Sequence, residues 1–154
     1  MVASAGADQT VRLWDIFDPS VTAPVGRVLA GHTNTVYGLA FSPNGKQLAS
    51  GGMDQSVRLW NLDDPTSPTS VGQAMLLGPG PGAGIAANSI VTAVDYAPDG
   101  RSLAITGADR TVRVWDLDAP TLVARICDTT VGNLTAQTWA QYFRDQAYEA
   151  LDCK

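Results

Sequence analysis

Cysteine, histidine and long apolar runs are scarce in this chain of 154 residues. It has two cysteines, Cys127 and Cys153, and one histidine, His32. Two cysteines are too few for a disulfide framework and lack metal-site spacing, so we interpret both as buried or idle thiols. A zinc site would have to be built from these distant cysteines, one histidine and carboxylates. We therefore expect no metal ligands and no metal catalysis.

Positive charge is also scarce, with 10 Lys and Arg against 15 Asp and Glu, a net charge of −5. Nucleic acids are bound through clustered Lys and Arg, so we expect no nucleic-acid partner. No run of about 18 apolar residues and no basic segment followed by an apolar core is present. The sequence thus predicts neither a membrane span nor a secretory signal, and we expect a cytoplasmic protein with no membrane partner.

The chain contains three copies of one sequence motif. Each copy has the pattern Asp-x-Thr/Ser-Val-Arg-Leu/Val-Trp, in which Asp precedes Trp by six residues. Two copies share an upstream turn, at 41–45 and 96–100, whose glycine lies fifteen residues before the Trp. Such a repeat indicates copies of one supersecondary unit that bury their faces against each other. The copies are Asp8–Asp15, Asp54–Asn61 and Asp109–Asp116.

Alternating apolar and polar residues, interrupted by turn residues, predict antiparallel strands around each motif. In the middle copy we expect strands over 36–41, 47–51 and 56–60, and in the third copy over 90–96, 102–106 and 111–115. Residues 1–6 align with the second strand of the middle copy. We expect outer strands near 26–30, near 71–75 and over 121–127.

These motifs resemble the WD40 repeat family, whose unit is a four-stranded blade of a β-propeller that ends in Trp-Asp and often opens with Gly-His. Gly31-His32 supplies that opening, with His32 twenty-eight residues before Trp60. The resemblance implies an all-β fold, a partial propeller of about two complete blades plus part of a third over residues 1–127. The expected boundaries are a partial blade at 1–30, a blade at 31–77 and a blade at 78–127 with a Gly/Pro-rich insertion at 78–89.

A propeller needs roughly four to eight blades to close its ring. We therefore expect the chain to begin inside a blade and to be the C-terminal part of a larger propeller. The alternatives are a truncated product and subunits that complete a ring by association. The Gly-rich insertion lacks the Lys-Ser/Thr that ends a phosphate-binding loop, so we interpret it as a surface loop and expect no cofactor.

Residues 128–154 form a tail of different composition. We expect a short C-terminal helix over 136–143, with Thr135 as its N-cap and Leu134 packing on Trp139. The tail is similar to the segment that ends many large bacterial WD40 signalling proteins, which implies a bacterial signalling role.

The residue types of a hydrolase triad occur at His32, Ser50 and Asp54, but the sequence offers no nucleophile elbow and no oxyanion hole. We therefore expect no catalytic residues. The resemblance implies instead a structural tetrad, in which Trp60 donates to Ser50 and His32 links Ser50 to Asp54. The matching residues are Ser4, Asp8 and Trp14 in the first copy and Asp109 and Trp115 in the third, where Ile105 and Ala87 replace the serine and the histidine.

The resemblance also implies a peptide-binding top face. We favour Tyr37 and Met53 as its contacts, because an aromatic ring beside a flexible thioether offers adaptable contact area. The alternative is that they only cover the edge of the blade. The expected positions are Thr35, Tyr37, Met53, Ile90, Thr92 and Ala108, with Ala7 in the first copy.

Together these observations predict a non-enzymatic protein-interaction, scaffold or sensor module. Its expected partner is a protein or peptide, including missing N-terminal blades or another subunit. The alternatives are a truncated structural fragment without independent binding and an enzyme.

Overall fold

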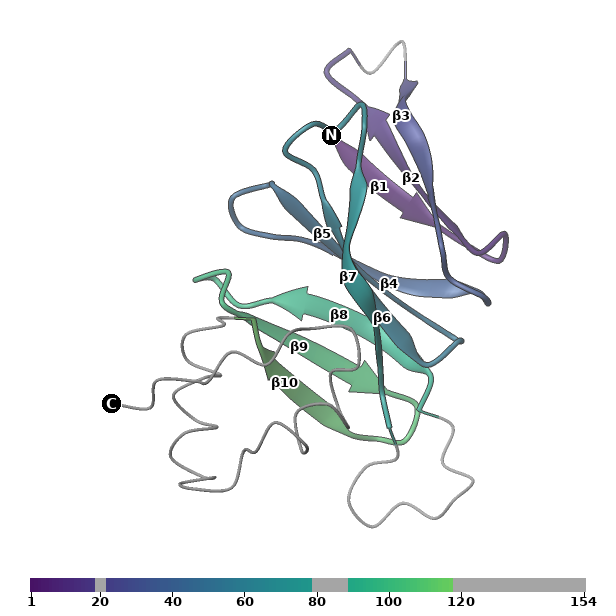
Figure 1. The fold of residues 1–154 in the computed structure, drawn as a ribbon, viewed down its shortest axis with the longest axis vertical. Coiled ribbons are helices and arrows are strands. Elements are labelled where there is room, and N and C mark those ends of the chain that lie inside the picture. The colour runs from purple at the N-terminus through teal and green to yellow at the C-terminus, as the bar shows by residue number, and fades with distance from the viewer. Residues whose placement is uncertain (19–21, 79–88, 118–154) are drawn as a thin grey trace, which may run out of the picture. The chain divides into compact units, whose positions relative to one another are not determined.

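The computed structural model describes residues 1–18, 22–78 and 89–117, which form three antiparallel β-sheets and no helix (Figure 1). The first sheet contains β1 (Val2–Ala5), β2 (Thr10–Asp15) and β3 (Ala23–Ala30) in that order. The middle sheet contains β4 (Val36–Phe41), β5 (Gln47–Gly52), β6 (Ser56–Asn61) and β7 (Thr69–Leu76) in that order. The third sheet contains β8 (Val91–Tyr96), β9 (Ser102–Gly107) and β10 (Val112–Asp116), with β9 at its centre.

The predicted strands are confirmed within a residue or two over the described part of the chain, and the all-β fold class with them. The outer strands predicted near 26–30 and 71–75 are β3 and β7, which are longer than expected. Three predictions fall outside the described residues: the strand over 121–127, the helix over 136–143 and most of the insertion at 78–89. No helix among the described residues has the length and apolar character needed to cross a membrane.

The Asp of each motif builds the turn that precedes the Trp-bearing strand. Its carboxylate accepts the backbone N–H of the residue two positions later, at 3.1 to 3.2 Å in all three copies. The residue between them adopts a left-handed backbone, with φ of 66°, 64° and 64° at Gln9, Gln55 and Arg110. Short side-chain bonds of this kind are how Asp stabilises tight turns. The repeated motif is therefore a turn-and-strand signal.

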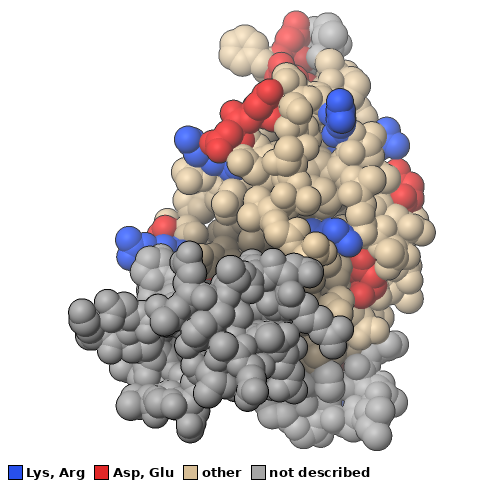
Figure 2. All heavy atoms as spheres, in the orientation of Figure 1, with Lys and Arg blue, Asp and Glu red and all other residues tan. Residues whose placement is uncertain are grey.

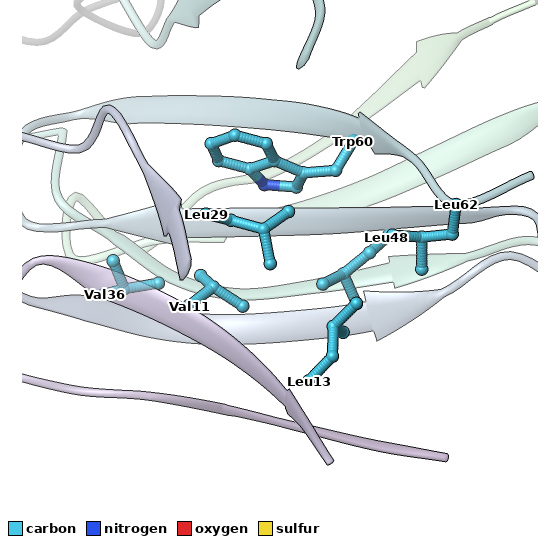
Figure 3. Packing of buried hydrophobic residues seen from close by; sticks show 7 residues of the cluster. All are labelled: Val11, Leu13, Leu29, Val36, Leu48, Trp60 and Leu62. Carbon is cyan, nitrogen blue, oxygen red and sulfur yellow. The ribbon is translucent and has the colours of Figure 1, made fainter. Parts of the chain in front are cut away.

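A core cluster of buried apolar residues lies between the first and middle sheets (Figure 3). Each sheet turns one row of alternating apolar side chains toward the other, so neither row faces water. The backbone also connects the two sheets, since the Val36 N–H donates to the Gly6 carbonyl at 3.2 Å. The cluster consists of Val11, Leu13, Leu29, Val36, Leu48, Trp60 and Leu62.

The middle and third sheets approach each other at two glycines. A Cβ built on Gly38 would lie 2.9 Å from the Ala93 Cα, and one on Gly51 would overlap the Val91 Cγ1. Glycine is required at such positions because any side chain would overlap atoms of the neighbouring sheet.

We expect Gly38→Ala to lower the free energy of unfolding by about 1–3 kcal/mol, because the new methyl group would push against the backbone of Ala93 rather than a flexible side chain. Urea denaturation followed by circular dichroism measures this. Gly6→Ala is the matched control, since a Cβ at that position would meet nothing within 4 Å beyond its chain neighbours, and its effect should stay below about 0.5 kcal/mol. Equal effects of the two substitutions would show that the sheets do not approach at Gly38.

Candidate functional site

A chain of hydrogen bonds runs through the middle sheet from the strand β6 to the turn after β5. The Trp60 indole Nε1–H donates to the Ser50 Oγ at 2.8 Å, and that Oγ lies 2.8 Å from the His32 Nε2. The His32 Nδ1 lies 2.8 Å from the Asp54 Oδ2. Since the Ser50 hydroxyl already accepts from the indole, its single hydrogen goes to the imidazole. The bonds are satisfied when His32 is neutral, with its proton on Nδ1.

Burial sets the protonation state of this cluster. The side chains of His32 and Asp54 are 0% and 6% exposed. Burial lowers the pKa of His32 below 6.5. The hydrogen bond and the charge of Asp54 act to raise this pKa, but the effect of burial is larger. Burial opposes ionisation of Asp54, but bonds from the Thr33 N–H, the Ser56 hydroxyl and His32 keep its pKa below 3.8. The pair is therefore a neutral imidazole against a carboxylate at neutral pH.

This geometry holds the sheet together and leaves no room for triad chemistry. Ser50 is 0% exposed and its oxygen is occupied by the Trp60 N–H, so no substrate carbonyl can reach it. A nucleophile needs an accessible position beside an oxyanion site. Within the described residues, no three His, Cys, Asp or Glu side chains are grouped as metal ligands.

The first sheet has the same arrangement without an imidazole. The Trp14 Nε1–H donates to the Ser4 Oγ at 2.7 Å. Asp8 accepts the hydroxyl and N–H of Thr10, which lower its pKa, and the Arg12 guanidinium stays at 3.4 Å. Asp8 and Arg12 are both about half exposed, at 55% and 47%. A cavity of about 370 Å³ lies beside these residues.

In the third sheet an arginine binds the carboxylate of the turn Asp. Ile105 is fully buried where the other sheets have serine, and Ala87 lies outside the described residues. The Arg113 guanidinium donates to the Asp109 carboxylate at 2.8 Å and to the Gly78 carbonyl at 2.8 Å. Arg113 thus ties the turn to the segment before the insertion. The sequence holds a signal for the Asp109–Arg113 pair, because Asp and Arg remain in the third copy while serine and histidine are lost.

The arginine of the middle sheet differs from its counterpart in the third. The Arg58 Nε is buried and has no hydrogen-bond partner among the described residues. Its guanidinium lies against Gly31, where a Cβ would be 2.8 Å from Nη1. In this sheet the turn carboxylate is bound to His32, whereas in the third sheet it is bound to the arginine. The carboxylate thus bonds to histidine where histidine is present.

The six predicted top-face residues lie in two equivalent groups. Thr35 accepts the Met53 N–H at 2.8 Å, and the Tyr37 hydroxyl donates to the Met53 Sδ at 3.8 Å. In the third sheet, Ile90 accepts the Ala108 N–H at 2.9 Å, and the hydroxyls of Thr92 and Thr106 lie 2.8 Å apart. Tyr37 lies in β4 and Thr92 in β8, two strands that are in contact at Gly38, and the other four residues lie just outside the strand ends. Ala7 is exposed on the first sheet.

Sequence patterns did not reveal that Tyr37 and Thr92 are bulge residues. Val36 pairs with Gly52 but Gly38 pairs with Gly51, so Tyr37 is an extra residue in β4. The same shift in register surrounds Thr92 in β8. A bulge turns its side chain away from the direction that strand alternation would give it, and bulges are frequent beside functional sites. Tyr37 and Met53 are 54% and 39% exposed.

Charged side chains of both signs lie on the face of the described residues shown in Figure 2, where they are interspersed among uncharged ones.

Comparison with known proteins identifies the repeat. The family described as WD domain, G-beta repeat, matches residues 1–15, 24–61 and 84–116, which together exceed half of the chain. The nuclear distribution protein PAC1 of Mycosarcoma maydis is 49% identical over 47 residues, which are 30% of this chain and 10% of that protein. The WD40 repeat-containing protein HOS15 of Arabidopsis thaliana is 47% identical over 51 residues, 31% of this chain and 7% of that protein. Both matches cover a small part of the relatives' length. Both relatives are eukaryotic, so the bacterial resemblance of the tail stays a prediction.

We expect Ser50→Ala to lower the free energy of unfolding by about 2–4 kcal/mol, because it leaves the Trp60 Nε1–H and the His32 Nε2 buried without a partner. Ser4→Ala removes the equivalent bond to Trp14 at an exposed position, where water replaces it, and should cost less than about 1 kcal/mol. Chemical denaturation of both variants measures the difference. A Ser50→Ala chain as stable as the Ser4→Ala chain would contradict the tetrad as a buried network.

We expect stability to fall as the pH drops below about 6.5. The folded-state pKa of His32 lies below its unfolded value, so the unfolded chain binds the proton first. Stability is complete above 6.5 and is lost as the pH falls toward the folded-state pKa, at no more than about 1.4 kcal/mol per pH unit. Because His32 is the sole histidine, His32→Gln should remove most of the slope between pH 7.5 and 5.5. Urea denaturation at several pH values tests this, and a flat profile for the unsubstituted chain would refute it.

Proposed function

Because the chain belongs to the WD40 repeat family, we propose that it is a non-enzymatic protein-interaction scaffold that binds an extended peptide at Tyr37 and Met53. The observation that carries this proposal is the pairing of an exposed bulge tyrosine with an exposed methionine. Tyrosine supplies a large ring with a polar end, and methionine adapts to irregular partners.

The backbone beneath the pair favours binding. The Met53 N–H is bonded to the Thr35 carbonyl, and the next residue, Asp54, is held by the tetrad. The Thr33 N–H also donates to Asp54, at 3.0 Å. The backbone beside Met53 and the backbone ahead of Tyr37 are therefore held in place in the absence of a partner. This reduces the conformational entropy lost on binding.

We further propose that the chain works within a larger propeller of a cytoplasmic signalling protein. The support is that both relatives are much longer than the segment they share with this chain, which is 10% and 7% of their length. The competing hypothesis is a structural fragment in which Tyr37 and Met53 only cover each other, as their 3.8 Å contact would allow.

A displayed library of random peptides, selected on the whole chain, distinguishes the two hypotheses. We expect enriched peptides whose affinity drops at least about 10-fold with Tyr37→Ala, or about 1.4 kcal/mol, and severalfold with Met53→Ala. Phe17→Ala is the control, because Phe17 is an aromatic residue that is 96% exposed on the first sheet. It should leave the affinity unchanged.

Two results would contradict the proposal. One is a selection that enriches no peptide. The other is a set of peptides that bind the Tyr37→Ala and Phe17→Ala chains equally well, which would place the contact elsewhere.

A further inference from the structure

We propose that Met53 is a site of reversible oxidation, at which a peroxide converts the thioether to a sulfoxide that the Tyr37 hydroxyl then binds. The sulfoxide closes the surface formed by these two side chains, and this consequence rests on the function proposed above. The oxidation and the bond to Tyr37 require no partner and can be measured without one.

Met53 is open to an oxidant in solution. The chain has three methionines, Met1, Met53 and Met75. Met53 directly follows β5 and is 39% exposed. Met75 lies within β7, where it pairs with Val57 of β6 and is partly buried. Since an oxidant must touch the sulfur, exposure favours oxidation of Met53 over that of Met75.

The backbone keeps Met53 beside Tyr37. The Met53 N–H donates to the Thr35 carbonyl at 2.8 Å, and the next residue, Asp54, is bound to His32 and to the Thr33 N–H. The main chain on both sides of the methionine is therefore held in place. An oxidised side chain remains next to Tyr37, because the backbone that carries it is fixed.

The oxidation step needs a peroxide and no group from the protein. A lone pair of the Met53 sulfur attacks one oxygen of hydrogen peroxide, the S–O bond forms and the O–O bond breaks. The departing hydroxide takes the proton of the transferred oxygen and leaves as water. Sulfur loses two electrons and the peroxide gains them. The reverse step takes two electrons from a pair of thiols, which become a disulfide while the oxygen leaves as water. Methionine sulfoxide reductases catalyse this reduction.

Tyr37 is placed to bind the product. Its hydroxyl already donates to the Met53 Sδ, at 3.8 Å, and a thioether sulfur is a weak acceptor. A sulfoxide oxygen is polar and accepts a hydrogen bond more strongly, so the hydroxyl moves from the sulfur to the oxygen. Tyr37 is 54% exposed, which leaves its ring room for this adjustment.

The oxidised pair is a poorer surface for a peptide. The flexible apolar thioether becomes a polar group, and the Tyr37 hydroxyl is bound within the pair. A peptide that covers the pair must remove water from the sulfoxide, which costs free energy unless the peptide replaces the lost hydrogen bonds. The equivalent residues of the other sheets are Ala7 and Ala108, which have no sulfur, so the effect is confined to the middle sheet.

Peptide mapping by mass spectrometry tests the site itself. After brief treatment of the whole chain with dilute hydrogen peroxide, we expect Met53 to be oxidised at least about 3-fold faster than Met75, because it is more exposed. Dithiothreitol then reverses any disulfide or sulfenic acid at the two cysteines and leaves the sulfoxide in place. Methionine sulfoxide reductase with dithiothreitol should restore Met53. Equal oxidation rates of Met53 and Met75 would overturn the proposal.

Nuclear magnetic resonance tests the bond to Tyr37 without a partner. The chain is labelled with ¹³C in its tyrosine rings, and Tyr37→Phe identifies the Tyr37 signals. We expect peroxide to shift these signals in a Met1→Leu/Met75→Leu chain, in which Met53 is the sole methionine. Met53→Leu should abolish the shift. Unshifted Tyr37 signals in a chain whose Met53 is fully oxidised would overturn the proposal.

The consequence for binding is tested with a peptide selected on the reduced chain. We expect peroxide to lower its affinity for the Met1→Leu/Met75→Leu chain at least about 5-fold, and reductase to restore it. The affinity of the Met53→Leu chain, whatever its starting value, should be the same before and after peroxide. An unchanged affinity of the oxidised Met1→Leu/Met75→Leu chain would overturn the closure. A selection that enriches no peptide would contradict the binding function, whereas selective oxidation with shifted Tyr37 signals would still support the site.

Discussion

The middle sheet depends on one neutral imidazole. His32 precedes β4, yet its two nitrogens bind Ser50 of β5 and the turn residue Asp54. Ser50 in turn fixes the Trp60 ring of β6, which packs into the core shared with the first sheet. Every polar atom in this chain of bonds is buried or nearly so, and a buried polar group without a partner is costly. The four side chains are therefore stable together, and the loss of one leaves its neighbours unpaired.

The carboxylate of the turn Asp has a different bonding partner in each of the three sheets. Each has an Asp in the turn and a Trp six residues later, but only the middle sheet holds the Asp with histidine. In the third sheet Arg113 satisfies Asp109 and Ile105 fills the serine position with an apolar group. In the first sheet the polar groups of Ser4 and Asp8 persist beside a cavity. The middle sheet thus bonds its turn carboxylate to histidine, the third sheet bonds it to arginine, and the first sheet bonds it to Thr10 and Arg12.

Local patterns predicted the strands well because the period-2 alternation and the turn residues act within a few positions of each other. The tetrad could be predicted because the resemblance to the WD40 family implies it at the positions of His32, Ser50, Asp54 and Trp60. The bond from Arg113 to the Gly78 carbonyl could not, since it joins residues 35 positions apart across a Gly/Pro-rich insertion. The bulge at Tyr37 and the close approach at Gly38 were also missed, because both depend on how a strand meets its neighbours rather than on its own composition.

The framework and the candidate binding surface share one segment of chain. Residues 32–37 carry the imidazole, the Thr33 N–H bound to Asp54, the Thr35 carbonyl bound to Met53 and the Tyr37 ring. The position of Tyr37 is thus set by bonds that begin at the tetrad. The candidate binding surface therefore depends on the same hydrogen bonds that hold the middle sheet together.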